Sequence, residues 1–207
     1  MGSKATYLKN KVIDHYLGKT AFVQPTPYLG LYTAAPTDAG GGTEVSGGSY
    51  ARVAISGSFG SAVTGASANT SDIEFAQATA NWGTAKAFGV FDASSGGNLM
   101  LWGYLIQTRF NFTAAVDDTV TAPGHTLVNG DAVIVEGSAL PTGLTEGTTY
   151  YVINAATNTL KLSLTVGGAA VDITAVGSGT IGKLVPKTIE SGDKAIFYTG
   201  SLTFTED

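Results

Sequence analysis

The sequence predicts a mainly β fold, and three features carry that prediction. The strand-forming residues Val, Ile, Thr, Tyr and Phe are common, whereas the helix-forming residues Glu, Lys, Arg, Leu and Met are scarce. Many of the 28 glycines lie between short apolar runs, as turn residues do. A chain of 207 residues can bury a core in one or two domains. We expect an antiparallel β-sandwich with a short N-terminal helix and an inserted small β-barrel-like module.

One helix is expected, at residues 5–17. Apolar side chains at Leu8, Val12 and Tyr16 recur at four-residue steps and form a stripe along one face. Ser3 is the expected N-cap, and a glycine after the last apolar residue is a natural C-terminal stop. We expect this helix to pack on the sandwich or to reach a neighbouring molecule.

After the helix, short strands alternate with turn-rich segments. In the first half of the chain the expected strands are Tyr28–Thr33, Tyr50–Ser56, Ile73–Phe75, Ala85–Asp92 and Asn98–Gln107. The last two are expected to form a hairpin around a glycine-containing loop. The glycine-rich segment at residues 35–49 lies between two strands, so we expect an ordered loop rather than a linker between domains.

The pattern changes near residue 109, where strands become shorter and more closely spaced. The strands expected there are Asp118–Ala122, Ala132–Glu136, Thr149–Asn154, Thr159–Leu164 and Val171–Thr174. Residues 187–207 then return to large alternating apolar residues, which predict long sheet strands. We therefore expect a parent β-sandwich of residues 1–108 plus 187–207, with residues 109–186 inserted as a small β module. Two consecutive domains, with a boundary near residue 110, are the alternative.

Charge and cysteine content exclude several classes of protein. Only 13% of the residues are charged, the net charge is −5, and no basic stripe with interleaved aromatic residues occurs, so we expect no nucleic-acid binding. The sequence has no cysteine, which excludes disulfides and thiolate metal sites. No apolar run approaches the roughly 20 residues that span a bilayer, and no secretory signal peptide is recognisable. We expect synthesis in a cytoplasm and no membrane insertion.

No motif for catalysis or cofactor binding stands out. The two histidines, His15 and His125, are far apart in the sequence, and a zinc site needs three or four converging ligands. The segment "GSGTIG" at residues 177–182 has the form of a dinucleotide-binding pattern, but no helix is expected after it. We therefore expect no enzyme activity, no catalytic residue, no metal and no cofactor.

Four long blocks of the sequence are characteristic. They read "YLKNKVIDHYLG", "GLYTAAPTDAGGGTEVSGGSYARV", "FAQATANWGTAKAFGVFDASSGGNLMLWG" and "KTIESGDKAIFYTGSLTFTED". Through these blocks, residues 5–107 and 187–207 resemble small virion proteins of tailed bacteriophages that are labelled phage tail fibre proteins. Residues 109–186 separately resemble a β module of phage tail and baseplate proteins, through "PGHTLVNGDAVIVEG", "LTEGTTYYVINA" and "GGAAVDITAVGSG".

The resemblance implies a non-enzymatic structural component of the virion, made in the cytoplasm of the bacterial host and assembled as an oligomer on the particle exterior. A trimer is expected by analogy with phage appendages. The expected partners are copies of the chain together with tail proteins. Alternatively, the chain is a capsid decoration protein that clamps the major capsid protein, or a carbohydrate-binding receptor module that contacts a host surface glycan.

Three residues are the candidate contacts with a partner or ligand. Tyr50 and Arg52 follow the glycine-rich segment directly, where a loop presents side chains to a neighbour. Trp82 precedes a strand in "TANWGTA", and we expect its indole to be exposed or to lie in an interface.

Overall fold

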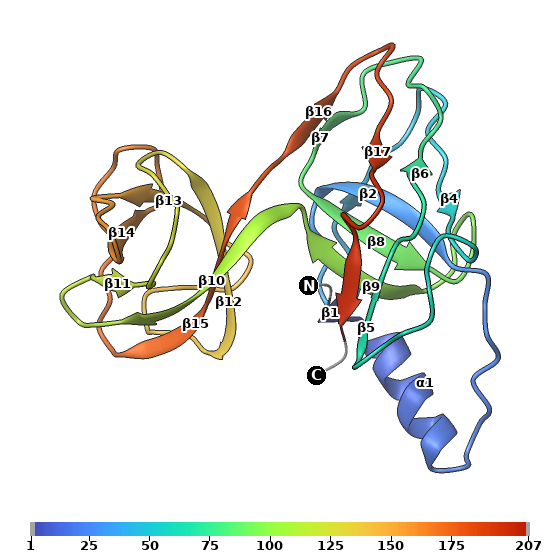
Figure 1. Ribbon diagram of the computed structural model, residues 1–207, viewed down its shortest axis with the longest axis horizontal. Helices are drawn as coiled ribbons and strands as arrows, with labels where there is room; N and C mark the ends of the chain where they lie inside the picture. The colour runs from blue at the N-terminus through green and yellow to red at the C-terminus, as the bar shows by residue number, and fades with distance from the viewer. Residues whose placement is uncertain (1–2, 206–207) are drawn as a thin grey trace. The chain divides into compact units, whose positions relative to one another are not determined.

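The computed structural model describes residues 3–205 and divides the chain into two compact units, each with its own core. Unit 1 contains the described residues up to Leu105 and those from Pro186 onwards, and unit 2 is Ile106–Val185. Figure 1 shows that both units are built from β-strands and that the described part of unit 1 also has one helix. The fold is therefore mainly β, as the composition predicts.

The helix α1 spans Thr6–Tyr16. Its N-cap is Ala5, so the expectation that Ser3 caps the helix is wrong. Ser3 belongs instead to strand β1 (Ser3–Lys4), whose pairing in the sheet keeps it extended, and its hydroxyl donates a hydrogen bond to Asp38 Oδ1 at 2.8 Å. Within residues 3–205 no helix has the length and apolar character needed to cross a membrane.

The main sheet of unit 1 has six strands and is antiparallel throughout. Its order is β1–β9–β8–β2–β3, and β4 also pairs with β2. The bounds are β2 Tyr28–Ala34, β3 Thr43–Glu44, β4 Val53–Ala54, β8 Ala87–Phe91 and β9 Leu99–Tyr104. The β8–β9 pairing confirms the expected hairpin. The strand expected at Tyr50–Ser56 shrinks to Val53–Ala54, because a turn from Gly47 O to Tyr50 N occupies its start.

Three short ladders form the second layer of unit 1. They pair β7 (Gly83–Ala85) with β16 (Lys187–Ile189), β6 (Ile73–Glu74) with β17 (Ile196–Phe197), and β5 (Ala66–Ala68) with β18 (Thr203–Thr205). The expectation of long C-terminal strands is therefore wrong. Turns that contain Gly192 and Gly200, both at positive φ, divide this segment into short strands.

The core of unit 1 lies between the main sheet and these ladders, which makes the unit a β-sandwich. Its large buried side chains are Leu29, Leu31, Phe88, Val90 and Met100 from the main sheet, and Ile73, Phe75, Ile189 and Leu202 from the second layer and its turns. Burial of these side chains is the main stabilising contribution, at about 1.5–3 kcal/mol for each fully buried one.

Unit 2 is a closed antiparallel barrel. Around the barrel the strands are β10 (Ile106–Ala114), β11 (Val120–Thr121), β14 (Thr159–Ser163), β13 (Thr149–Ile153), β12 (Ala132–Ala139) and β15 (Gly177–Leu184). Its interior is filled by side chains that include Phe112, Val133, Tyr150 and Ile181. Closure pairs the strands on both sides and so removes free sheet edges.

The strand that closes the barrel was not expected. β15 contains the "GSGTIG" segment, whereas Val171–Thr174 is not a strand. Close neighbours explain these glycines: a Cβ on Gly179 would lie 2.6 Å from the Glu136 carbonyl oxygen, and one on Gly182 would lie 2.8 Å from the Ile106 side chain. Because glycine has no side chain, such a strand lacks the alternation by which strands are recognised.

Excision of unit 2 tests the prediction that it is an insertion. Its two ends lie side by side, since Ile106 pairs with Leu184. Replacing residues 106–185 by a short Asn-Gly turn is expected to leave a soluble protein whose free energy of unfolding changes by no more than about 1 kcal/mol, because loop-closure entropy varies only logarithmically with length. Urea denaturation followed by tryptophan fluorescence measures this change, and both tryptophans lie in unit 1. An insoluble product, or a gradual transition, would show that the two units depend on each other.

Candidate functional site

The three candidate residues lie in or beside the glycine-rich loop that joins β2 to β4. The loop is packed closely against its surroundings, and two glycines show why. A Cβ on Gly42 would lie 2.6 Å from the Ala34 carbonyl oxygen, and one on Gly48 would lie 2.8 Å from the Ala80 nitrogen. Both residues also have positive φ, of 75° and 51°. Only glycine fits these positions without strain, so the loop depends on them for its path.

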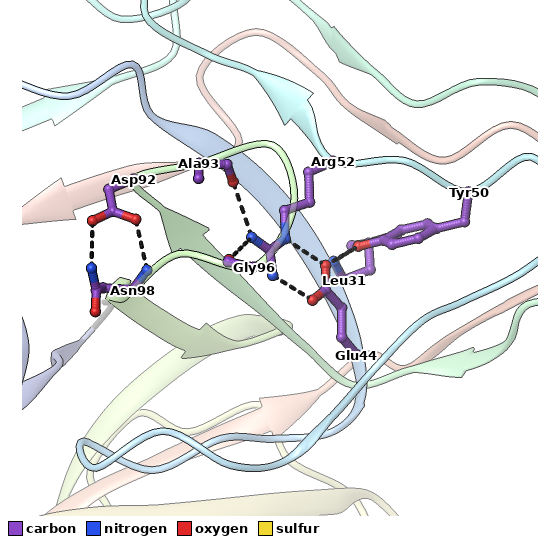
Figure 2. A network of polar contacts seen from close by, with 8 residues as sticks. All are labelled: Leu31, Glu44, Tyr50, Arg52, Asp92, Ala93, Gly96 and Asn98. Carbon is purple, nitrogen blue, oxygen red and sulfur yellow. Dashed lines mark hydrogen bonds and ion pairs between the residues drawn. The ribbon is translucent and has the colours of Figure 1, made fainter.

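Arg52 is the centre of a polar network, which Figure 2 shows. Its Nε and Nη2 donate to the two carboxylate oxygens of Glu44 at 2.8 and 2.7 Å. Its Nη1 donates to the backbone oxygens of Ala93 and Gly96 at 3.0 and 2.7 Å, at the tip of the β8–β9 hairpin. The guanidinium carbon lies 3.2 Å from the centroid of the Phe91 ring. The side chain is only 8% exposed, so its hydrogen-bonding capacity is used inside unit 1.

The hairpin tip that binds Arg52 is itself held by Asp92. Asp92 Oδ1 accepts a hydrogen bond from the Asn98 backbone nitrogen at 2.6 Å, and Oδ2 accepts one from Asn98 Nδ2 at 2.8 Å (Figure 2). Burial acts to raise the pKa of Asp92, but the hydrogen bonds from Asn98 and Tyr7 outweigh it and hold the pKa below its usual range. Asp92 therefore remains an ionised acceptor that closes the tip.

Tyr50 connects the Glu44 carboxylate to the main sheet. Its hydroxyl donates to Glu44 Oε1 at 3.0 Å and accepts from the Leu31 backbone nitrogen at 2.8 Å. Its ring stacks on Phe75, with centroids 6.0 Å apart. Burial, followed by the neighbouring Glu44 charge, raises the pKa of Tyr50, so the hydroxyl stays protonated and keeps donating.

Trp82 is buried, so the expectation that it is exposed is wrong. Its side chain is 4% exposed, and its Nε1 donates to the Gly48 carbonyl oxygen at 2.8 Å. The indole meets the Tyr50 ring edge-on, with centroids 5.2 Å apart. The Trp82 backbone nitrogen also donates to Ile189 O, which fixes the residue in the second layer. These contacts depend on the folded loop and could not be read from the segment around Trp82.

The structure thus brings the three candidates into one series of contacts, from Arg52 through Glu44 and Tyr50 to Trp82. Glu44 is the residue that the sequence analysis missed, although a signal exists. From residue 39 to residue 71 the only charged residues are Glu44 and Arg52. Two opposite charges in an otherwise uncharged segment are expected to pair when the segment is buried.

This arrangement holds the loop, the hairpin tip and the core together. Within residues 3–205 no group of three or more His, Asp or Glu side chains could hold a metal ion. The polar groups of Tyr50, Arg52 and Trp82 are engaged inside unit 1. Contact of these residues with a partner or ligand therefore stays a prediction.

Comparison with known proteins gives one informative match. The family model described as "Podophage GP4 fiber I protein gp80" matches residues 3–140, which is more than half of the chain. The match includes the glycine-rich loop, the β8–β9 hairpin and the first three strands of unit 2. It crosses the boundary between the units and ends before residues 187–207, so the insertion of unit 2 stays a prediction. No curated protein matches the sequence.

Tyr50→Phe tests the network at two pH values. At pH 7 the variant leaves the Leu31 N–H without its acceptor, so we expect the free energy of unfolding to fall by about 1–3 kcal/mol. Because the folded protein raises the pKa of Tyr50, its neutral hydroxyl stabilises the wild type fully below about pH 10, and this contribution is lost as the pH rises further. The variant has no such loss. From pH 7 to pH 11 the difference in free energy of unfolding between the wild type and Tyr50→Phe should therefore narrow by up to about 1.4 kcal/mol.

Urea denaturation at both pH values measures this difference. Tyr198→Phe is the control at pH 7, because Tyr198 is exposed and its loss should leave the stability unchanged. A difference in free energy of unfolding between the wild type and Tyr50→Phe that stays constant up to pH 11 would show that the hydroxyl of Tyr50 does not stabilise the fold through these hydrogen bonds.

Proposed function

The chain belongs to the family of the podophage GP4 fiber I protein gp80, and from this premise we propose that it is a structural component of the tail of a podophage virion that acts by assembling with copies of itself. Membership of a fibre family supports the location on the virion and the structural role. Assembly with identical copies and a place on the tail are more specific proposals. The surface of unit 1 supports the assembly.

One observation carries the assembly: the helix end, which we define as Ile13, Tyr16 and Leu17, is apolar and uncovered. These side chains are 54, 80 and 67% exposed, and no residue of α1 is buried. Figure 1 shows α1 extending away from the sheets of unit 1. Val23, in the segment that follows, is 81% exposed. Apolar side chains gathered on a protruding element are typical of a surface that a partner covers.

Low charge supports the same conclusion. Charged residues make up 13% of the chain, about half of the usual ~25%. Few charges mean little repulsion between copies and little charge to desolvate when two surfaces meet. A chain of this composition can therefore pack closely against identical chains at a small electrostatic cost.

Quantitative protein composition of purified virions, with and without tails, tests the proposed function. We expect the protein in intact particles at a copy number that matches the tail and lies far below that of the major capsid protein. It should be lost when the tails are removed. A copy number close to that of the major capsid protein, retained on tailless heads, would instead show a decoration protein. Absence from the virion would contradict the structural role.

A further inference from the structure

We propose that the helix end of one copy docks into an apolar groove on unit 1 of a second copy. This inference rests on the proposed assembly function and gives the contact that produces it. The two surfaces are different parts of one unit, and each lacks in the single chain what the other supplies.

The groove lies beside the first turns of α1 and has a volume of about 310 Å³. Leu8, Ile55, Phe59, Met100 and Phe204 are among its walls, and all of its lining residues except Gln24 and Ser56 are apolar. The volume is at the lower end of the range of about 300–1,000 Å³ for ligand pockets, so it can receive a few side chains. Filling such a groove with apolar side chains is favourable because it removes apolar surface from water.

The helix end cannot fill the groove of its own chain. Leu8 lines the groove, and Tyr16 lies two turns further along the same rigid helix, about 12 Å away at 1.5 Å per residue. Tyr16 is also 80% exposed, so it touches little of unit 1. Unit 1 of a single chain therefore leaves both surfaces without an apolar partner.

Charge supports a second copy as the partner. The segment of residues 3–24, which contains α1, has four lysines and one aspartate and therefore a net charge of +3. The other described residues of unit 1, 25–105 and 186–205, have four basic and seven acidic residues and a net charge of −3. These opposite net charges favour association of the helix segment of one copy with the sandwich of the next.

The helix end and the groove are different patches, so two copies can exchange the contact reciprocally about a two-fold axis, or several copies can form it head to tail. Heterologous contacts form a closed ring when the rotation from one copy to the next closes, and otherwise an open filament. Every helix end and every groove is occupied both in a reciprocal dimer and in any closed ring of three or more copies.

Two variants test the contact from its two sides. Tyr16→Ser with Leu17→Ser removes the helix end, and Ser56→Trp fills the groove from an exposed position on its wall. Val166→Ser is the matched control, because Val166 is a similarly exposed apolar residue in unit 2. Analytical ultracentrifugation should show an oligomer for the wild type and the control. Both variants should sediment as monomers, with a dissociation constant raised at least ~10-fold. Near-ultraviolet circular dichroism checks that each variant keeps the native fold.

Mixing the two variants gives the sharpest test. The helix-end variant keeps an intact groove, and the groove variant keeps an intact helix end, so an equimolar mixture should form a 1:1 complex. The complex should stop at that size, because its remaining helix end and groove are both disabled. A monomeric mixture, a monomeric wild type, or folded variants that still form the wild-type oligomer would each overturn the docking.

These measurements use the purified protein and separate the docking from the proposed function. A protein that is present on virion tails but monomeric in solution would refute the docking and leave the structural role in place. An oligomer that behaves as proposed but is absent from virions would support the docking and refute the structural role in the virion.

Discussion

The ion pair between Arg52 and Glu44 is the interaction on which the irregular part of unit 1 depends. An arginine side chain that is only 8% exposed is costly unless its donors are satisfied, and here a carboxylate and the carbonyls of the hairpin tip satisfy them. Removal of one partner of this partly buried pair leaves the other without its hydrogen bonds, which typically destabilises a protein by about 1–3 kcal/mol. The pair thus holds the glycine-rich loop against the hairpin tip, two segments that have little apolar surface of their own.

The order of this loop also reaches the helix α1. Asp38, in the same loop, accepts hydrogen bonds from Ser3 Oγ and Trp102 Nε1 and forms an ion pair with Lys9. Its backbone oxygen accepts a hydrogen bond from the Thr6 nitrogen at 2.8 Å, at the start of α1. A loop that is fixed at Arg52 therefore also fixes the direction in which α1 leaves the sheet. In the assembly proposed above, the partly buried ion pair would support the contact at a distance.

The sequence predicts those parts of the fold that local patterns encode. Short apolar runs bounded by turn residues indicate β2 and the β8–β9 hairpin, and four-residue spacing indicates α1. In the second layer, β6 was expected at Ile73–Phe75, and residues 187–207 were expected to form long strands rather than three short ones. Local patterns do not give the bounds of these short strands, because distant partners define them. β15 was not predicted, because its glycines remove the alternation of apolar and polar residues. The burial of Trp82 was not predicted either, because it depends on Gly48, which is far from Trp82 in the sequence. At the site, the isolated charges of Glu44 and Arg52 indicate a pair, but backbone acceptors such as those of the hairpin tip carry no sequence signal.

Hydrogen–deuterium exchange of Arg52→Ala tests most directly whether the ion pair holds the loop and the hairpin tip. Lys194→Ala is the control, because the Lys194–Glu74 pair is exposed, at 45 and 46%, and such pairs contribute little to stability. We expect amides in residues 35–49 and 92–98 to exchange faster in Arg52→Ala, while those in residues 106–185 keep their protection and the control matches the wild type. Unchanged exchange in both segments of folded Arg52→Ala would show that the loop is held without the pair, and would contradict this account.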